Sequence, residues 1–232
     1  MSMQSTAPKS RTRTTRTAAP KITPRTRTPK LAETRLFALE SEGNYDSRRF
    51  FDQHADGETL DATLGTFLDC SFEDMSAGAL VLDQAHVSET SLSGCGLARL
   101  HMVGALLADC SLTGCRLGSV DAMESVLRSV EFKDCRIGYL NLRDAKWRDV
   151  RFENCAIDEF DGVGAQLTRL SFAGCQINSI NLQHATVSNV DLRDARLARI
   201  EGVEYLRGTT MSLDQIADLA AAFAESLGIR TL

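Results

Sequence analysis

The sequence predicts an all-β solenoid, a four-sided β-helix of about seven 20-residue coils, with a C-terminal α-helix and a disordered N-terminal tail. Mostly large apolar residues recur at every fifth position from Phe67 to Gly202, and a second apolar or small residue stands two positions before nearly all of them. Cysteines also recur with a period of 20 from Cys95 to Cys175. A period of five fits neither a helix of 3.6 residues per turn nor a flat strand with its alternation of two. It is typical of a chain that turns a corner every five residues.

Residues 1–30 are predicted to form a disordered basic tail, because Thr-Arg repeats and prolines leave almost nothing to bury. Residues 1–35 hold nine Lys or Arg and one Glu, whereas the whole chain has a formal net charge of −5. Such a tail is a solvated segment, a segment that folds back weakly on its own acidic body, or an arm that binds nucleic acid. A transit peptide is disfavoured, since the segment has no amphipathic apolar face.

Residues 31–60 lack the repeat and are predicted to form an irregular N-terminal cap. Phe37, Phe50 and Phe51 supply the apolar side chains that would cover the first coil.

Residues 61–205 are predicted to form the β-helix, and a period of 20 sets the size of its coil. At that period the residues two before each apolar centre sort into columns of one type, such as Leu80, Leu100, Val120, Leu140 and Phe160, whereas a period of 15 mixes the types. Four corners of five residues therefore close one coil. Stacked coils rise by about 4.8 Å each, which is the spacing of paired strands.

All seven cysteines occupy the inward position two before a centre. We interpret them as small buried hydrophobes. Their odd number and burial indicate a reducing, cytoplasmic location. A straight column of thiols cannot surround a metal ion tetrahedrally, so we expect neither a metal nor a cofactor.

Residues 206–232 are predicted to form a C-terminal helix. Ser212 and Gln215 form a capping box and Gly228 is the expected C-cap. One side of this helix is apolar and consists of Ile216, Leu219, Ala220, Phe223 and Leu227. This side covers the open end of the last coil, pairs with a second subunit, or does both.

The repeat resembles the pentapeptide-repeat family, as in Cys-Ser-Phe at 70–72, Leu-Asn-Leu at 140–142 and Val-Asp-Leu at 190–192. This resemblance implies a right-handed quadrilateral β-helix. Leu-Arg-Gly at 206–208, the helix and Leu-Gly-Ile at 227–229 resemble the ending of members that protect DNA gyrase from quinolones. In those members the C-terminal region forms the dimer, which implies a homodimer and a type II topoisomerase as partner.

Two outward columns are rich in carboxylates and are the candidate binding surfaces. The first contains Asp69, Glu89, Asp109, Ser129, Asp149, Arg169 and Asn189, and the second contains His101, Asp121, Asn141, Asp161, Asn181 and Glu201. Asp and Asn beside a corner bond to local backbone, so the second column can simply stabilise turns. Alternatively, stacked carboxylates imitate the phosphates of DNA, as the resemblance suggests. The net charge of the repeat region is much sparser than that of duplex DNA, and a basic cluster surrounds Trp147 at mid-rod: Arg143, Lys146, Arg148 and Arg151.

No catalytic constellation is visible in the sequence. Three of the four histidines, His86, His101 and His184, fall in different outward columns, and no phosphate-binding glycine loop is present. No stretch is long and apolar enough to cross a membrane. The sequence therefore favours a non-enzymatic cytoplasmic protein that acts as a rigid scaffold for an unidentified protein partner. The alternatives are a DNA-mimic dimer that binds a type II topoisomerase, and nucleic-acid association through the basic tail.

Overall fold

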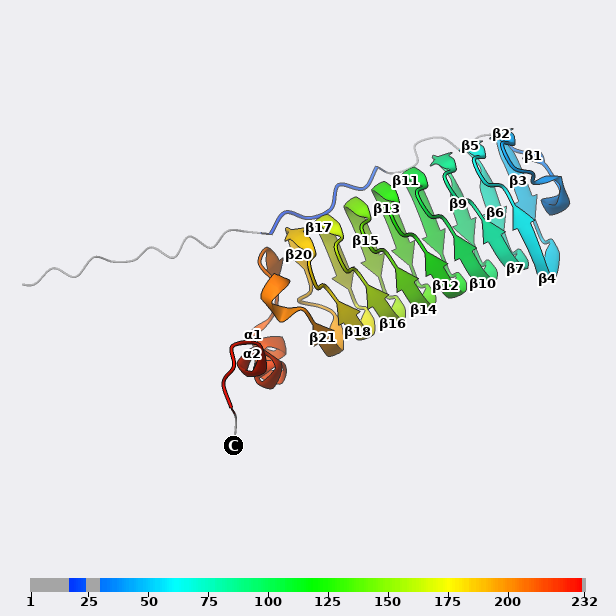
Figure 1. Cartoon of the computed structure of the whole chain (residues 1–232). Coiled ribbons are helices and arrows are strands. Elements are labelled where there is room, and N and C mark those ends of the chain that lie inside the picture. Colours follow the sequence, from blue (N-terminus) through cyan, green and yellow to red (C-terminus); the bar gives the residue numbers. More distant parts are fainter. Residues whose placement is uncertain (1–16, 24–29, 231–232) are drawn as a thin grey trace, which may run out of the picture.

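The computed structural model describes residues 17–23 and 30–230. The chain forms a straight rod, a parallel β-solenoid of about nine turns with two short helices at its C-terminal end (Figure 1). Cα partners in neighbouring coils keep the period of 20 over most of the rod, as in Leu107↔Leu127 and Trp147↔Leu167. The predicted four-sided coil with its period of 20 is thus confirmed.

Two parallel sheets make up the walls of the rod. One contains β4 (His54–Asp61), β7 (Ser76–Val81), β10 (Gly96–His101), β12 (Arg116–Asp121), β14 (Arg136–Asn141), β16 (Ala156–Asp161), β18 (Gln176–Asn181) and β21 (Arg196–Glu201). The other contains β1 (Ala32–Glu33), β2 (Asn44–Asp46), β3 (Arg48–Phe51), β5 (Thr66–Leu68), β6 (Ser71–Glu73), β8 (His86–Ser88), β9 (Ser91–Ser93), β11 (Leu106–Thr113), β13 (Val126–Lys133), β15 (Lys146–Glu153), β17 (Gln166–Ala173), β19 (Thr186–Ser188), β20 (Val190–Asp191) and β22 (Thr209–Thr210).

The apolar centres fill the rod, and of those predicted from Phe67 to Gly202 all but Leu197 are buried. Like side chains stack on like: the ring of Phe152 lies 4.7 Å from that of Phe132 and 5.0 Å from that of Phe172, between ring centroids. Trp147 points inward with 1 % of its surface exposed. Each buried side chain of this size contributes on the order of 1.5–3 kcal/mol, so the stacked interior stabilises the rod.

A buried serine among these inward positions has a structural role. Ser125 accepts a hydrogen bond from the Trp147 indole N–H at 3.1 Å and donates its own to the Ala122 carbonyl at 2.6 Å. The indole nitrogen is thereby satisfied in the interior.

Residues 31–60 are not irregular, which corrects the sequence prediction. They form strands that continue the solenoid, with Tyr45 paired to Phe67 and Leu60 paired to Leu80. The second pair keeps the period of 20, whereas the first exceeds it by two, and the register shifts inside β4 between them. This two-residue insertion hides the repeat from a search with a fixed period of five.

The side chains at the N-terminal end also differ from the prediction. Only Phe50 of the three expected phenylalanines is buried, whereas Phe37 is 71 % and Phe51 41 % exposed. Leu36, in the 3-10 helix η1 (Leu36–Ala38), is buried and covers the first coil in their place.

The C-terminal segment starts with the 3-10 helix η2 (Val203–Tyr205) and forms two helices, α1 (Leu213–Asp218) and α2 (Ala220–Ser226), where one was predicted. They meet at Leu219, whose backbone leaves the helical region and whose side chain is buried. The Ser212–Gln215 capping box is present. The Gln215 amide also donates to the carbonyls of Leu192 at 2.6 Å and Ala195 at 2.7 Å, so the helix start closes the last coil.

Candidate functional site

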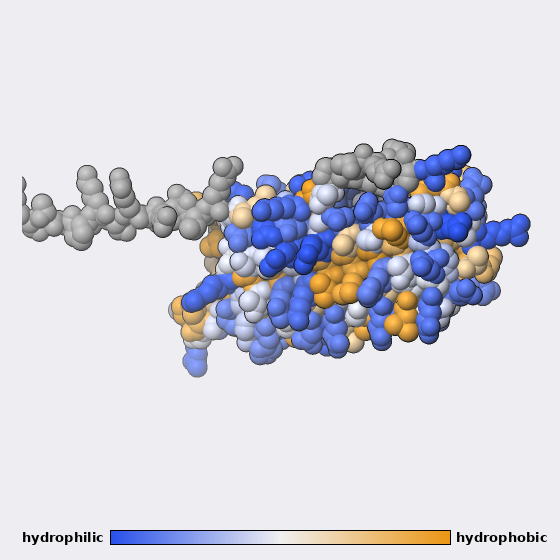
Figure 2. Space-filling model, turned by 90° about the horizontal axis from the view of Figure 1, so that it is seen from above, coloured by the Kyte–Doolittle hydropathy of each residue, from blue (hydrophilic) through white to orange (hydrophobic). Residues whose placement is uncertain are grey.

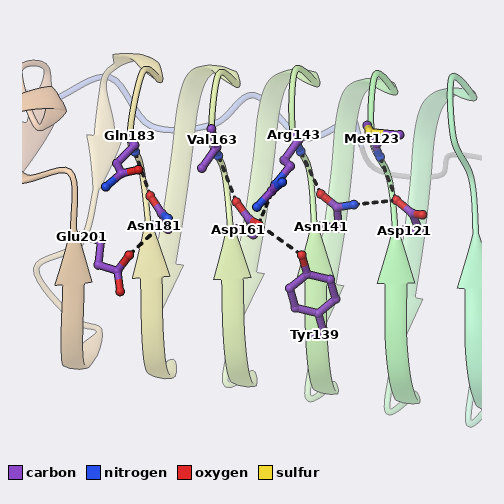
Figure 3. Close-up of polar contacts among 10 residues, drawn as sticks. All are labelled: Asp121, Met123, Tyr139, Asn141, Arg143, Asp161, Val163, Asn181, Gln183 and Glu201. Carbon is purple, nitrogen blue, oxygen red and sulfur yellow. Dashed lines mark hydrogen bonds and ion pairs between the residues drawn. The ribbon is translucent and has the colours of Figure 1, made fainter.

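The second predicted column is the first candidate site. It occupies the ends of successive strands from β12 to β21, and Figure 3 shows its side chains in a row along the rod. We call this row the Asx ladder; it contains Asp121, Asn141, Asp161, Asn181 and Glu201.

Each Asx side chain of the ladder holds its own corner. The side-chain oxygen accepts a hydrogen bond from the backbone N–H two residues later, at 3.2 Å for Asn141 with Arg143 and 3.0 Å for Asn181 with Gln183. The same contact at Asp121 and Asp161 is longer, at 3.4 and 3.3 Å. This is the Asx turn, in which a short side chain takes the place of a backbone acceptor. The local-backbone interpretation of the column therefore accounts for these residue types.

Neighbouring rungs of the ladder also bond to one another. The Asn141 amide donates to Asp121 at 2.9 Å, and the Asn181 amide donates to Glu201 at 3.3 Å. Amide and carboxylate alternate from Asp121 to Asn181, so no two carboxylates of the ladder are direct neighbours there, and the repulsion of like charges is avoided.

Asp161 is the best-held carboxylate of the ladder. It accepts from the Arg143 guanidinium at 2.8 Å and from the Tyr139 hydroxyl at 3.1 Å, and 12 % of its side chain is exposed. Burial, followed by the charge of Asp161, raises the pKa of Tyr139, so its hydroxyl keeps its proton. Arg143 and Tyr139 thus fix the carboxylate in place.

An open hollow of about 550 Å³ lies beside the ladder and is the largest of those described for this surface. Its lining includes Tyr139, Arg143, Glu159, Asp161, Arg199 and Glu201. The three carboxylates and Arg199 are carried on strands β16 and β21, and Arg143 lies in the turn that follows β14. A polar surface of mixed charge that is fixed in this way can bind a partner by complementary hydrogen bonds and ion pairs.

The first predicted column lies at a different corner, and we call it the corner column. All seven of its residues, from Asp69 to Asn189, have a positive φ between 49° and 57°. Asp and Asn are the residues other than glycine that adopt this left-handed conformation most readily. The backbone conformation of the corner therefore explains much of the column's composition.

Residues 17–23 lie along the corner column and correct the prediction of disorder for that part of the tail. We call this segment the strap; Figure 1 shows it running lengthwise across several coils. Backbone N–H groups of Ala18, Lys21 and Thr23 donate to column side chains, namely Asn189 at 3.1 Å, Asp149 at 2.8 Å and Ser129 at 2.8 Å. The remainder of the predicted tail, apart from Lys30, lies outside the described residues.

The strap matches the column in register. Between the bonds to Asn189 and Asp149 the strap passes the coil of Arg169, whose side chain has no hydrogen-bond acceptor. At this point the strap has the buried residue Pro20, whose backbone has no N–H to donate. Three residues of extended chain span about 10 Å, and two coils rise by about the same distance. Column side chains that are far apart in the sequence thus meet donors that are close together in the strap.

Asp149 is the central contact under the strap. It receives the Arg169 guanidinium at 2.6 and 2.5 Å in addition to the Lys21 N–H. The bond from Arg169 is the main cause that lowers the pKa of Asp149. Asp149 is therefore charged, and its carboxylate is already bonded to Arg169 and Lys21. Glu89 and Asp109 of the same column line a hollow of about 160 Å³ beside Ile22 and Thr23 of the strap.

The cysteines agree with the interpretation of buried hydrophobes. All seven are free and buried. Burial raises the pKa of the Cys70 thiol, and Cys135 donates to the Leu112 carbonyl at 3.3 Å. Within the described ranges, no group of three or more His, Cys, Asp or Glu side chains is arranged to hold a metal ion.

The predicted apolar side of the C-terminal helices is divided. Leu219 is buried and Phe223 packs against the core, whereas Ala220 is exposed. Four large apolar side chains of this region stand in solvent: Leu213, Ile216, Leu227 and Ile229. The helices thus cap the last coil with one part of their surface and leave the other part uncovered.

Sequence reasoning gave a tail that folds back on its own acidic body as one alternative, but it did not locate the strap on the corner column, and it missed the hollow beside the ladder. The sequence signal for the strap was present, since Ala18, Ala19, Pro20 and Ile22 form a short apolar stretch in an otherwise polar tail. The hollow needs Tyr139 and Arg199, which lie one column away from the ladder and carry no distinctive pattern.

The comparisons with known proteins agree with this architecture. Residues 85–161 match the family model described as a pentapeptide repeat region. Over these residues the chain therefore contains a pentapeptide repeat region. No curated protein sequence matches the chain significantly.

Solved structures of pentapeptide-repeat proteins resemble the chain at low identity. A trypsin-treated form of QnrB1, a plasmid-mediated fluoroquinolone resistance protein, has a TM-score of 0.36 and 16 % identity, covering 82 % of this chain and 100 % of that one. Full-length QnrB1 has a TM-score of 0.33 and 17 % identity, with 78 and 100 % covered. HetL, involved in heterocyst differentiation regulation in the cyanobacterium Nostoc sp. strain PCC 7120, has a TM-score of 0.30 and 16 % identity, with 74 and 90 % covered. No helix among the described residues could span a membrane.

Proposed function

We propose that this pentapeptide-repeat protein is a non-enzymatic scaffold that binds a partner protein on the face of the Asx ladder. The observation that carries the proposal is the fixed geometry of that face. Its carboxylates and amides are bonded to their own corners and to one another, and they border an open hollow of about 550 Å³. Preorganised polar groups lose little entropy when a partner binds, so such a surface favours specific association.

Site-specific photo-crosslinking in the producing cells tests this function. A photoreactive residue at Ser179, which lines the hollow, is expected to give one major high-mass adduct. The matched control is the same residue at Gln176, an exposed position on β18 outside the hollow. Equal adducts from both positions, or none from Ser179, would count against the ladder face.

A second candidate function, a DNA-mimic dimer that binds a type II topoisomerase, draws on two surface features. Leu213 and Leu227 are 86 and 75 % exposed at the C-terminal end, where a second subunit could cover them. Beyond the described strap, the corner column also continues with Asp109 and Glu89. Unchanged gyrase supercoiling and quinolone-stabilised cleavage in the presence of excess protein would remove this candidate.

The dimer itself is tested by the molar mass in solution. Light scattering on the whole chain is expected to give about twice 25.4 kDa if the exposed leucines pair. The double variant Leu213→Ser, Leu227→Ser should then fall to the monomer mass, because it leaves Leu219 and the cap intact.

A further inference from the structure

A second surface, on the side of the rod next to the strap, combines exposed apolar residues with cations that have no ion-pair partner among the described residues. It consists of the outward residues of β5 and β8 and of the first three residues of β11, β13 and β15. We call it the apolar–cationic face; it contains Thr66, Leu68, His86, Ser88, Leu106, Ala108, Val126, Arg128, Lys146 and Arg148.

The half of this face nearer the N-terminal end of the rod carries its exposed apolar side chains, together with Thr66, His86 and Ser88. Leu68 is 41 % and Leu106 42 % exposed, and Leu106, Ala108 and Val126 line a shallow hollow of about 460 Å³. Figure 2 shows apolar side chains gathered in the middle of the rod on this side, with hydrophilic side chains beside them. A contiguous apolar patch on a polar rod indicates an interaction site, because scattered single side chains would not form a hollow.

Leu64 extends the apolar character to the corner that precedes the face. It has a φ of +61° and is 49 % exposed. The same corner carries Gln84, Gly104, Glu124 and Asp144 in the next four coils. A branched apolar side chain is strained in this conformation, and about half of Leu64 remains exposed to solvent. Leu64 thus lies beside the apolar half of the face and enlarges the apolar surface that is exposed there.

The other half of the face is cationic. Arg128, Lys146 and Arg148 are exposed, and within the described part of the chain none of the three forms an ion pair. By contrast, Lys133 and Arg151 on the adjoining face both pair with glutamates of neighbouring coils. The outward strand positions of the apolar–cationic face hold no Asp or Glu.

The nearest carboxylates stand at the two corners that bound the face. Glu124 and Asp144 lie on one side. The corner column, with Asp69, Glu89, Asp109 and Asp149, lies on the other, and there Asp149 is already bonded to Arg169 and the strap. A ligand that lies flat on the face therefore meets the three cations before it meets these acids.

We propose that the apolar–cationic face docks a segment of a partner protein in which large apolar side chains are followed or preceded by carboxylates. A second copy of this chain presents the same cations on its own face, and the chain's N-terminal tail is basic, so both would be repelled. Nucleic acid would pair its phosphates with the cations but would leave the leucines in water. The proposal rests on the scaffold function but places a partner on a different face from the ladder.

The dimensions of the face define a probe. Leu68 and Arg148 are four coils apart, which is about 19 Å, and about six residues of extended chain cover that distance. The probe is a labelled octapeptide of four leucine or tryptophan residues followed by four glutamates, together with its reversed sequence. Two control peptides replace the glutamates by glutamine or the apolar residues by serine.

Fluorescence anisotropy with the full chain measures binding. At least one of the two mixed peptides is expected to bind at least tenfold more tightly than either control peptide. The double variant Arg128→Glu, Lys146→Glu should weaken that binding about tenfold, and Leu106→Ser should weaken it about fivefold. The matched control is Arg116→Glu, Arg136→Glu, a pair of exposed arginines in neighbouring coils of β12 and β14, which should leave binding unchanged.

Each other outcome overturns the proposal. These outcomes are no binding of either mixed peptide up to about 1 mM, an equal loss in the control variant, or tighter binding of a 16-nucleotide oligothymidine than of the mixed peptides. Circular dichroism and thermal melting of every variant separate lost binding from lost folding. The crosslinking experiment at Ser179 tests the ladder face, which is a different face of the rod. Failure of the peptide-binding experiment therefore does not imply failure of the crosslinking experiment, or the reverse.

Discussion

The Asx ladder and the corner column run along the same rod with similar residue types, but they are held in different ways. In the ladder every bond is local or joins adjacent coils, as between Asn141 and Asp121. The corner column is tied by a strap from the far end of the sequence, which bonds to Asn189, Asp149 and Ser129 and passes over the coil between the first two. In a solenoid each coil otherwise contacts only its neighbours. The repeat fixes where polar side chains stand, whereas residues outside the repeat decide which of them stay open to a partner.

The largest expected effect is the loss of the central contact under the strap. Asp149→Ala should lower the free energy of unfolding by about 2 kcal/mol, because it removes charge-assisted bonds to Arg169 and Lys21 and leaves the guanidinium without its acceptor. Urea denaturation measures the change. Asp109→Ala is the matched control, since Asp109 has the same left-handed backbone in the same column and no bond from the strap, and it should cost less than about 0.5 kcal/mol. Equal costs at the two positions would mean that only the corner conformation matters.

The same contact predicts a dependence on pH. The pKa of Asp149 is lowered in the folded chain, mainly by Arg169, so its stabilisation is fully present above the usual Asp pKa of about 3.9. That stabilisation is lost as the pH falls from about 4 through the lowered pKa. The difference in unfolding free energy between the unaltered chain and Asp149→Ala should therefore be constant from pH 5 to 7 and shrink toward pH 2.5. A difference that persists at pH 2.5 would contradict a role for the charged carboxylate.

In the ladder, Asp161→Ala should cost about 1.5 kcal/mol, because it removes the bonds from Arg143 and Tyr139 to a nearly buried carboxylate. Asp121→Ala should cost less, about 0.5–1 kcal/mol, since from the described part of the chain Asp121 accepts only the Asn141 amide at 2.9 Å and a long contact from Met123. Both values come from urea denaturation. A larger loss at Asp121 would show that the amide rungs, and not Arg143, hold the ladder.

The fold was predictable from the sequence because its signal is repeated in every coil. The same buried position recurs in each coil, as the cysteines from Cys95 to Cys175 and the stacked phenylalanines show. A single atypical residue therefore does not obscure the period. The first coils were not predicted because the two-residue insertion in β4 changes the spacing between those coils and the rest of the repeat. The single predicted helix divides at Leu219, where burial against the last coil competes with helical geometry.

The candidate sites were only half predictable. The positions of both columns follow from the period of 20. Which column side chains are bonded by the strap does not follow from it. Lys21 lies 128 residues before Asp149, and no spacing rule links them. The apolar–cationic face depends on Leu106 and Arg128 being neighbours in successive coils without carboxylates between them, a property of the surface that emerges only when the coils are stacked.

A smaller effect sharpens the description of the ladder. Asn141→Asp should lower the free energy of unfolding by about 1 kcal/mol at pH 7, because it places three carboxylates in consecutive rungs between Asp121 and Asp161. The loss should decrease in 1 M NaCl, which screens exposed charges. Asn178→Asp beside Asp158 on another face is the matched control for a single like-charge pair, and it should cost less.

The smallest expected effect concerns the register of the strap. Ala18→Pro removes the N–H that bonds to Asn189, whereas Ala19→Pro changes a residue beside Pro20 that makes no such bond. Trypsin cleavage after Lys21 in the native protein should therefore accelerate about threefold in Ala18→Pro and stay unchanged in Ala19→Pro, since one hydrogen bond is worth about 0.5–1 kcal/mol. If both variants are cleaved at the rate of the unaltered chain, burial of Pro20 holds the strap and the matched donors contribute nothing. If both variants are cleaved faster by the same factor, backbone flexibility at Ala19 matters as much as the hydrogen bond from Ala18. The position of the strap is then not set by the match between Pro20, which has no N–H, and Arg169, which has no side-chain acceptor.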